Sequence, residues 1–429
     1  MKKIINIAIV GLGQIGNYLY NELNKKKTDI EIKTGKKIKI IAISAKNKNK
    51  KRKFKINKKI FFQNPLDIIN KYKVDILFEA IGNSDGISKK IVENSIKKGI
   101  HVITPNKALI AKHGDYLAKL AERHKVNLEF EASVAGGVPI LRTIKEGLAT
   151  NKIYKVYGIL NGTCNYILSE MEKTKDSFQN VLKKAQNLGY AEPGKPKYDL
   201  NGYDALAKVR ILSSLSFNKK LSKNKCLMEG IENIDFKDIE IANQLNFRIK
   251  LLGITELINN KLFERVHPCL VKKDSYIGNV NGVMNAVITN GNPVGESILQ
   301  GEGAGPGPTT SALMSDLLSI LRGNIKYPFG ITNLKRKISS IYDVKNYQNS
   351  LYLRFEVRDI PGVLSQITKN LANKNISVQR LIQIPNQKMK TASIVIITHK
   401  SKEINVQNCI KSFKSNSNIL KNPILIRLF

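Results

Sequence analysis

The chain contains little cysteine and has no long apolar runs. Its four cysteines, Cys164, Cys226, Cys269 and Cys409, stand far apart, and none is spaced like a CxxC pair or a cluster of metal ligands. This scatter argues against a disulfide framework and favours a reducing, cytoplasmic compartment. No uninterrupted apolar stretch is long enough to span a bilayer, so we expect no membrane association.

The start of the chain superficially resembles a secretory signal. Two lysines precede an apolar run at residues 4–10, but the run stops at Gly11 and no small-residue cleavage site follows. A signal peptide requires such a site. A strand that enters a turn is therefore the favoured interpretation.

Acidic residues are also scarce, with 34 Asp and Glu against 71 Lys and Arg, which gives a formal net charge of +37. Such an excess could serve binding to nucleic acid or to an anionic surface. The lysines, however, occur along the whole chain, and the densest run, residues 46–59, contains one aromatic residue, Phe54. A single-strand binding platform would interleave several aromatic residues. We therefore attribute the charge to compositional bias and expect no nucleic-acid partner.

Short apolar runs and helical patterns alternate in the first third of the chain. The runs at residues 4–10, 38–43, 74–81 and 100–104 are rich in Ile and Val and end in turn residues, as buried parallel strands do. The order predicts an α/β protein with a doubly wound N-terminal sheet. We place this domain at residues 1–135, completed by about 303–330.

The remaining chain divides into three segments. Residues 136–302 mix glycine-rich turns with helical patterns, which indicates a mixed α/β substrate domain. Residues 331–350 are polar and basic, so we expect a linker that lets the preceding body fold without the last domain. Residues 351–429 show the pattern strand, helix, strand, strand, helix, strand, which is the ferredoxin-like, split-βαβ plan.

The hexapeptide GLGQIG at residues 11–16 fits the pattern GxGxxG, and it follows an apolar strand and opens a helix. That context makes the motif specific for a dinucleotide site. Gly11 permits the tight turn, Gly13 lets backbone N–H groups approach the pyrophosphate, and Gly16 allows close packing of helix on strand. We expect Gln14 and Ile15 to contact the cofactor as well.

The second predicted strand ends without a carboxylate, in Ser44, Ala45 and Lys46, and the basic run follows. A carboxylate at this point would select NAD by bonding the ribose 2′-hydroxyl. The basic residues would instead accommodate a 2′-phosphate, although loose lysines are a poor substitute for a positioned arginine. The sequence therefore predicts NADP(H) in preference to NAD(H).

Two lysines are candidates for the proton donor that reduction of a carbonyl requires, because the carbonyl oxygen becomes an alkoxide. Lys107 lies in the motif TPNKA and Lys208 in DLNGYDALAK. Asp204 and Lys208 are four residues apart on a predicted helix and share a face. This spacing alone favours a surface ion pair worth a few tenths of a kcal/mol; a catalytic pair is the alternative.

Further motifs occur in a fixed order after the glycine turn. They are TPNKA (104–108), EASVAGGVPI (131–140), GILNGTCNYIL (158–168), LGYAEP (188–193), DLNGYDALAK (199–208), VHP (266–268) and GEGAG (301–305). Together they resemble homoserine dehydrogenase over about residues 1–322. The resemblance implies NAD(P)H-dependent, reversible reduction of L-aspartate 4-semialdehyde to L-homoserine in threonine and methionine biosynthesis. It also implies a homodimer or homotetramer, with dimerisation through the middle domain.

The resemblance assigns roles to individual residues. It makes Lys208 the proton donor and places Lys107 beside substrate and nicotinamide. Residues that would bind polar groups of the substrate are Glu192, Asp199 and Asp204, and residues that would line the cofactor are Thr104, Gly189 and Gly303. The segment from Glu131 also resembles the family's monovalent-cation loop, in which a sodium ion would be held by Glu131, Val134, Gly136 and Val138.

The opening of the last domain, VRDIPGVL at residues 357–364, resembles an ACT regulatory domain. Asp359 and Gly362 flank the predicted turn into its first helix, where backbone N–H groups could hold an amino-acid carboxylate. Threonine is the expected effector. The alternative is an appendage that stabilises the fold and binds nothing.

Two other functions stay open at this point. Another semialdehyde oxidoreductase could use the same scaffold, but oxidation through a thioester needs a cysteine nucleophile beside a base. The second is a nucleic-acid-associated protein that contains a dinucleotide-binding domain. Its affinity for nucleic acid would fall steeply as the salt concentration rises.

Overall fold

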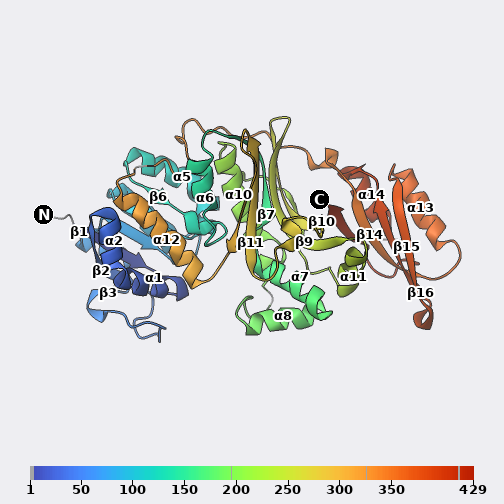
Figure 1. The fold of residues 1–429 in the computed structure, drawn as a ribbon, viewed down its shortest axis with the longest axis horizontal. Helices are drawn as coiled ribbons and strands as arrows, with labels where there is room; N and C mark the ends of the chain where they lie inside the picture. The colour runs from blue at the N-terminus through green and yellow to red at the C-terminus, as the bar shows by residue number, and fades with distance from the viewer. Residues whose placement is uncertain (1–3, 195, 325, 414–415) are drawn as a thin grey trace.

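The computed structural model describes residues 4–194, 196–324, 326–413 and 416–429. Three parts follow one another along the long axis of the molecule (Figure 1). The N-terminal parallel sheet lies at one end, a mixed sheet lies in the middle, and the strands and helices of the C-terminal part lie at the other end.

The first sheet has six parallel strands in the order β3-β2-β1-β4-β5-β6. Their bounds are β1 (Ile4–Val10), β2 (Lys37–Ser44), β3 (Phe61–Phe62), β4 (Ile76–Glu79), β5 (His101–Ile103) and β6 (Leu128–Glu129). This is the strand order of a dinucleotide-binding Rossmann sheet. The predicted doubly wound domain is therefore confirmed.

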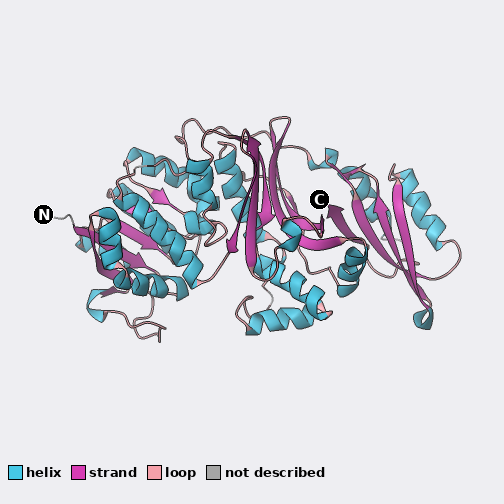
Figure 2. Ribbon diagram, viewed as in Figure 1, coloured by secondary structure: helices cyan, strands magenta, loops and turns pink. Residues whose placement is uncertain are grey.

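Helices cover both faces of this sheet (Figure 2). One face carries α1 (Gln14–Lys25), α2 (Lys27–Thr34) and α12 (Pro306–Leu321), and the other carries α3 (Pro65–Lys71), α4 (Ile87–Lys97) and α5 (Lys107–Arg123). Successive side chains of β1 point to opposite faces of the sheet, which explains the division. Ile7 and Ile9 pack with Leu317 of α12. Ala8 and Val10 belong to the core that contains α4 and α5. The chain thus returns to its first sheet after the middle domain.

The middle domain is built on antiparallel strands in the order β12-β11-β7-β9-β10. Its strands are β7 (Lys152–Ile159), β8 (Leu227–Met228), β9 (Phe247–Ile258), β10 (Lys261–Lys272), β11 (Met284–Asn292) and β12 (Gly295–Glu302). Its helices are α6 (Ile140–Arg142), α7 (Gly162–Thr174), α8 (Phe178–Asn187), α9 (Lys197–Leu200), α10 (Tyr203–Ser216) and α11 (Phe236–Gln244). The mixed α/β character expected from the sequence is present.

The C-terminal part has the element order expected from the sequence. Its main elements are β14 (Leu351–Arg358), α13 (Val363–Asn373), β15 (Val378–Asn386), β16 (Thr391–Thr398), α14 (Glu403–Ser412) and β18 (Ile424–Leu428), with β13 (Gln348–Asn349) pairing β17 (Ser401–Lys402). The strand order β18-β14-β16-β15 is that of a split-βαβ sheet. β18 also pairs in parallel with β10, at Cys269 with Arg427 and Leu270 with Leu428. One sheet therefore continues from the middle domain into the C-terminal part.

Residues 331–350 are not the loose linker expected from the sequence. Arg336 is 2% exposed and forms an ion pair with Asp115 at 2.8 Å, and the Tyr342 N–H donates to the Leu262 carbonyl at 2.8 Å. Further on, Arg427 binds Glu229 through two hydrogen bonds of 2.7 and 2.9 Å. Removal of residues 351–429 would take from the middle domain the short pairing of β18 with β10 and the arginine bound to Glu229. That the body folds without these residues stays a prediction.

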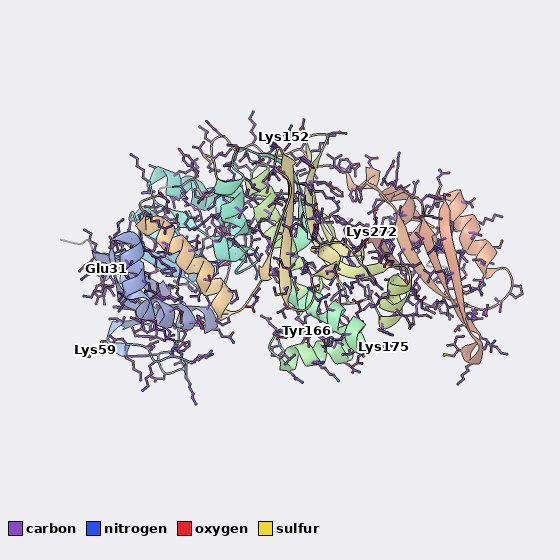
Figure 3. All side chains as sticks on the ribbon, viewed as in Figure 1. Glu31, Lys59, Lys152, Tyr166, Lys175 and Lys272 are labelled. Carbon is purple, nitrogen blue, oxygen red and sulfur yellow. The ribbon has the colours of Figure 1, made fainter. Side chains whose placement is uncertain are left out.

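Exposed lysines occur on separate parts of the molecule. In Figure 3 the exposed Lys59 lies on the first domain, and the exposed Lys152, Lys175 and Lys272 lie on separate parts of the middle domain. Among the residues described, no helix is both long and apolar enough to cross a membrane.

Candidate active site

The turn between β1 and α1 tolerates only glycine at two positions. Gly11 has a φ of +94°, and a Cβ there would lie 2.4 Å from the Ala80 carbonyl oxygen. A Cβ at Gly16 would lie 1.9 Å from the Gly11 carbonyl oxygen. The space beside Gly13 is open to at least 4 Å, so a pyrophosphate could approach the amide groups at the start of α1.

Two cavities lie beside this turn. One, of about 730 Å³, is lined by Gly11 and Gly13 together with Ser44 and Arg52 near the end of β2. The other, of about 490 Å³, is lined by Gln14 and Ile15 and extends to the middle domain. The turn thus separates space suited to the adenosine half of a dinucleotide from space suited to its nicotinamide and a substrate.

Arg52 is a candidate cofactor residue that the sequence analysis missed. Its guanidinium donates hydrogen bonds to the carbonyls of Asn47 at 2.7 Å, Lys50 at 3.0 Å and Leu12 at 3.4 Å. These bonds hold the side chain against the glycine turn and the end of β2. The signal in the sequence was a single arginine within the run of lysines at residues 46–59.

Asp204 is shared by two lysines in the second cavity. Its Oδ1 lies 2.7 Å from Lys107 Nζ, and its Oδ2 lies 2.8 Å from Lys208 Nζ. Asn161 donates to Asp204 at 3.0 Å and to Asp199 at 2.8 Å. Asp204 is 3% exposed and Lys208 is 7% exposed. The spacing alone favoured an ion pair on the surface. This prediction is wrong, because the pair is buried.

The two lysines differ in their electrostatics. Burial is the largest influence on both, and it lowers the pKa of Lys208 below its ordinary value. For Lys107, burial also acts to lower the pKa, but the charge and the hydrogen bond of Asp204, together with the charge of Asp199, outweigh burial and raise the pKa. Burial works to raise the pKa of Asp204, but Lys208 and Lys107 together hold it well below its usual range. Asp204 thus stays ionised, and Lys208 is the lysine that releases a proton more readily.

The other residues expected at the substrate or the cofactor divide into two groups. Asp199 and Gly189 line the same cavity as Lys208, as does Gly303. A Cβ at Gly303 would lie 2.0 Å from Asn285 Cγ, so a side chain at this position would force the buried Asn285 to move. Glu192 is exposed and is not among the residues that line the cavity.

Thr104 is placed differently from the expectation. It is fully buried, and its hydroxyl donates to Glu79 at 2.6 Å instead of lining either cavity. Glu79 also accepts from Ser88 at 2.7 Å and from the Ile81 N–H at 2.8 Å. Thr104 therefore fixes the loop before α5 on the end of β4.

The expected cation loop has its carboxylate already engaged. Both oxygens of Glu131 accept backbone hydrogen bonds at the start of α6, from Leu141 at 2.9 Å and Arg142 at 2.7 Å. Gly136 has a φ of +53°, and a Cβ there would lie 2.4 Å from the Gly303 carbonyl oxygen. The loop thus packs on the glycine segment that lines the active-site cavity. Of the expected sodium ligands, the backbone at Val134, Gly136 and Val138 would have to supply most of the coordination.

None of the four cysteines has the character of a nucleophile. Burial raises the pKa of Cys226 and Cys409 to about 11 and of Cys269 to about 12. It raises the pKa of Cys164 well above its ordinary value. A thioester route needs an accessible thiolate, and no cysteine provides one.

A buried lysine outside the motifs holds one wall of the site. Lys250 is 1% exposed, and its Nζ donates to the Val280 carbonyl at 2.6 Å and to Asn281 and Asn165 at 3.1 and 3.2 Å. Asn165 in turn donates to the Gly282 carbonyl at 2.9 Å. The sequence analysis missed Lys250, because nothing in the sequence distinguishes it from the many other lysines of the chain.

The segment held in this way contributes Val283 to the wall of the active-site cavity. A Cβ at Gly162, the first residue of α7, would lie 2.7 Å from the Val283 carbonyl oxygen. Lys250 and Asn165 therefore determine how closely this wall approaches the start of α7.

The fold and the cavity together define a nicotinamide-dependent oxidoreductase. The glycine turn supplies the dinucleotide site, and the cavity beside it holds a buried lysine that can donate a proton. A family model described as homoserine dehydrogenase matches residues 139–318, and a second, for the NAD-binding domain of homoserine dehydrogenase, matches residues 11–131. The chain belongs to the homoserine dehydrogenase family.

Known proteins match along the whole chain. Homoserine dehydrogenase of Neisseria gonorrhoeae is 37% identical over 432 residues, 99% of each chain, and that of Helicobacter pylori is 36% identical over the full length of both. The crystal structure of a homoserine dehydrogenase from Thiobacillus denitrificans has a TM-score of 0.90 at 33% identity, covering 100% of this chain and 99% of that chain. The crystal structure of Staphylococcus aureus homoserine dehydrogenase has a TM-score of 0.75 at 30% identity, covering 100% of this chain and 99% of that chain.

The charge of Lys250 has a testable effect on stability. Burial lowers its pKa to about 8, whereas the unfolded chain keeps the ordinary value of 10.5. Between these values the unfolded state binds more protons, so this group makes stability rise with pH. We expect the unfolding temperature of the wild type, relative to Lys250→Met, to increase from about pH 7.5 to about pH 10.

The exposed Lys272 on β10 provides the control, because Lys272→Met removes the same charge without burial. Thermal unfolding at matched ionic strength measures both variants. A pH-independent difference between wild type and Lys250→Met would show that Lys250 does not titrate in this range.

Proposed function

We propose that this protein catalyses the reversible reduction of L-aspartate 4-semialdehyde to L-homoserine, with NADPH as the preferred reductant. The observation that carries the proposal is the buried carboxylate of Asp204 between Lys107 and Lys208, in the cavity beside the glycine turn. Membership of the homoserine dehydrogenase family supports the choice of substrate. The high thiol pKa values disfavour the alternative of aldehyde oxidation through a thioester.

Each residue of the cluster has a task in this mechanism. When bound, the reduced nicotinamide supplies the hydride that adds to the aldehyde carbon. Lys208 donates a proton to the aldehyde oxygen, which becomes the hydroxyl of homoserine. Lys107 keeps its charge and stabilises the negative charge that develops on that oxygen. Asp199 accepts a hydrogen bond from the substrate ammonium group.

Replacement of Lys208 by alanine tests both the reaction and the proton donor. The wild type should oxidise NADPH when L-aspartate 4-semialdehyde is added, followed by absorbance. Lys208→Ala should lower kcat by at least about 100-fold, since the proton donor and its charge are lost. NADPH binding, measured by fluorescence, should remain. The control variant is Lys183→Ala, at an exposed lysine, and it should behave as wild type. Near-normal turnover of Lys208→Ala would mean that Lys208 is not the proton donor and would assign that role to Lys107.

Preference for NADPH rests on Arg52. Its guanidinium is held at the end of β2, where a carboxylate would select NAD, and it lines the cavity next to Ser44. Because four backbone carbonyls already accept from this guanidinium, it acts on a 2′-phosphate mainly through its positive charge and its remaining N–H. The lysines at 46 and 50 line the same cavity and add positive charge.

Arg52→Gln should therefore lower kcat/KM for NADPH by about 10- to 100-fold, the value of one charge-assisted hydrogen bond. The value for NADH should change little, because NADH has no 2′-phosphate. Lys48→Gln is the matched control, since Lys48 is exposed and is not among the lining residues. Equal losses with both cofactors would show that Arg52 supports the loop and does not recognise the phosphate.

We further propose that a monovalent cation occupies the loop from Glu131 to Val138. The turn at Gly136 and the carbonyl-rich backbone favour hard-oxygen coordination, whereas the engaged carboxylate limits the contribution of Glu131. Activity in sodium should exceed activity in tetramethylammonium at constant ionic strength. Full activity in tetramethylammonium would leave the loop with a packing role only.

For the C-terminal part we propose a regulatory role, with threonine as effector. Gly362 has a φ of +88° and directly precedes α13, and the exposed Asp359 lies nearby. These groups suit the carboxylate and the ammonium of an amino acid. The continuous sheet from β10 to β18 provides a physical connection to the middle domain.

Threonine at millimolar concentration should lower the activity of the full-length enzyme. Asp359→Asn should abolish the inhibition by threonine. It should keep the rate measured without threonine, because Asp359 does not line the active-site cavity. Asp274→Asn, at an exposed site on the middle domain, is the control. The role is refuted if the wild type ignores threonine and calorimetry detects no heat with it.

A further inference from the structure

Asn161 lies at the junction of α7, α9 and α10, beside the active-site cavity. It directly precedes α7, and it lines the cavity together with Asp199 of α9 and Asp204 of α10. Asn161 is 4% exposed. An amide side chain carries no charge and does not ionise. Any contribution of Asn161 to the reaction therefore comes through the groups that it binds.

The hydrogen bonds of Asn161 allow its amide one orientation. Its Oδ1 accepts from the Cys164 N–H at 2.8 Å, which caps the start of α7. Because a backbone N–H can only donate, the atom that faces it must be the amide oxygen. The NH2 group then donates to Asp199 at 2.8 Å and to Asp204 at 3.0 Å. A rotated amide would lose all three bonds, so the helix cap fixes the group that faces the two carboxylates.

The two carboxylates differ in their other partners. Lys107 and Lys208 both pair with Asp204, whereas Asp199 receives its hydrogen bond from Asn161. Burial and the charge of Asp204 raise the pKa of Asp199, and the bond from Asn161 acts to lower it, as do the charges of the two lysines. This bond uses Oδ1 of Asp199, so Oδ2 can accept from a substrate.

Other titratable groups near Asp199 do not share its pH range. Burial raises the pKa of Tyr198 above its ordinary value, and it raises the pKa of Cys164 well above the ordinary value. The pKa of Asp204 is instead held well below its usual range by Lys208 and Lys107. Asp199 is therefore the first of these carboxylates to take up a proton as the pH falls.

We propose that Asn161 is a positioning residue for substrate recognition, whose amide group aims the ionised Asp199 carboxylate at the ammonium group of the substrate. This inference rests on the proposed role of Asp199 in binding that ammonium group. Because the cap on α7 fixes the amide, the start of this helix sets where the substrate ammonium lies relative to Lys208. Asn161 thus acts through Asp199 and does not itself take part in proton transfer.

Asn161→Ser separates the bonds to the carboxylates from the helix cap, because serine caps helices about as well as asparagine and has no NH2 group. KM for L-aspartate 4-semialdehyde should rise by at least about 10-fold, since a charge-assisted hydrogen bond to Asp199 is lost. The value of kcat should fall by a smaller factor, because Lys208 keeps its bonds to Asp204 and to the Leu160 carbonyl, at 2.8 and 2.5 Å. NADPH binding, followed by fluorescence, should be unchanged.

The pH profile of kcat/KM provides a second measurement. Loss of the NH2 group raises the pKa of Asp199, and the added carboxylate of Asn161→Asp raises it further. Activity that needs ionised Asp199 is lost as the pH falls through this pKa. The acid limb should therefore lie at higher pH in Asn161→Ser than in wild type, and at still higher pH in Asn161→Asp. The aspartate variant keeps the shape of the side chain and its acceptor for the cap.

Ser177→Ala is the control for capping, because Ser177 caps α8 at an exposed site that does not line the cavity. It should lower the unfolding temperature and leave KM and the pH profile unchanged. In an Asp199→Asn background, Asn161→Ser should raise KM no further, since residues that act through one another are not additive.

A wild-type KM and acid limb in Asn161→Ser would overturn the proposal and leave Asn161 with a capping role only. The same rise of KM in the presence and absence of the Asp199 carboxylate would also overturn it, because Asn161 would then act independently of Asp199. Failure of the proposed function is recognised separately, since the wild type itself would then not oxidise NADPH with the semialdehyde, and the inference would fall with it.

Discussion

The carboxylate of Asp204 is the constraint around which the active site is organised. Burial of a lone carboxylate is strongly unfavourable, and Asp204 remains ionised because Lys107 and Lys208 lie at hydrogen-bonding distance on either side. Lys107 begins α5 of the first domain, whereas Lys208 and Asp204 belong to α10 of the middle domain. The ion pair of Lys107 with Asp204 therefore also links the two domains.

The chain path supports this arrangement. After the middle domain, the backbone returns through the glycine segment at Gly303 and packs α12 on the first sheet. Gly303 lines the active-site cavity and adjoins Gly136 and Asn285. The backbones at Gly136 and Gly303 approach closely, and the Asn285 side chain packs against Gly303, so the cavity wall has little freedom. The segment that Lys250 and Asn165 hold completes this wall.

The features predicted well from the sequence are those set by local patterns. Strand and helix periodicity indicated the Rossmann sheet and the order of elements in the C-terminal part, and the spacing of Gly11, Gly13 and Gly16 located the turn. The family resemblance also pointed to the motif that contains Asp204 and Lys208, and both residues line the active-site cavity. These patterns depend on neighbours along the chain.

Other features depend on contacts between distant residues, and the sequence did not reveal them. Arg52 is distinguished from the adjacent lysines only by its bonds to backbone carbonyls of a folded loop. Pairing of β18 with β10 makes one sheet of two expected domains, and no local pattern encodes such a register. Glu192 and Thr104 stand on motifs, yet one is exposed and the other is bonded to Glu79.

The central claim is that Asp204 and Lys208 act as one unit in proton donation. A double-mutant cycle with Asp204→Asn, Lys208→Ala and the combined variant measures this, using kcat for the reduction of the semialdehyde. Residues that act together lose activity non-additively. The double variant should be no slower than Lys208→Ala alone by more than about threefold. If the double variant instead shows the product of the two separate losses, Asp204 and Lys208 act independently and the account is contradicted.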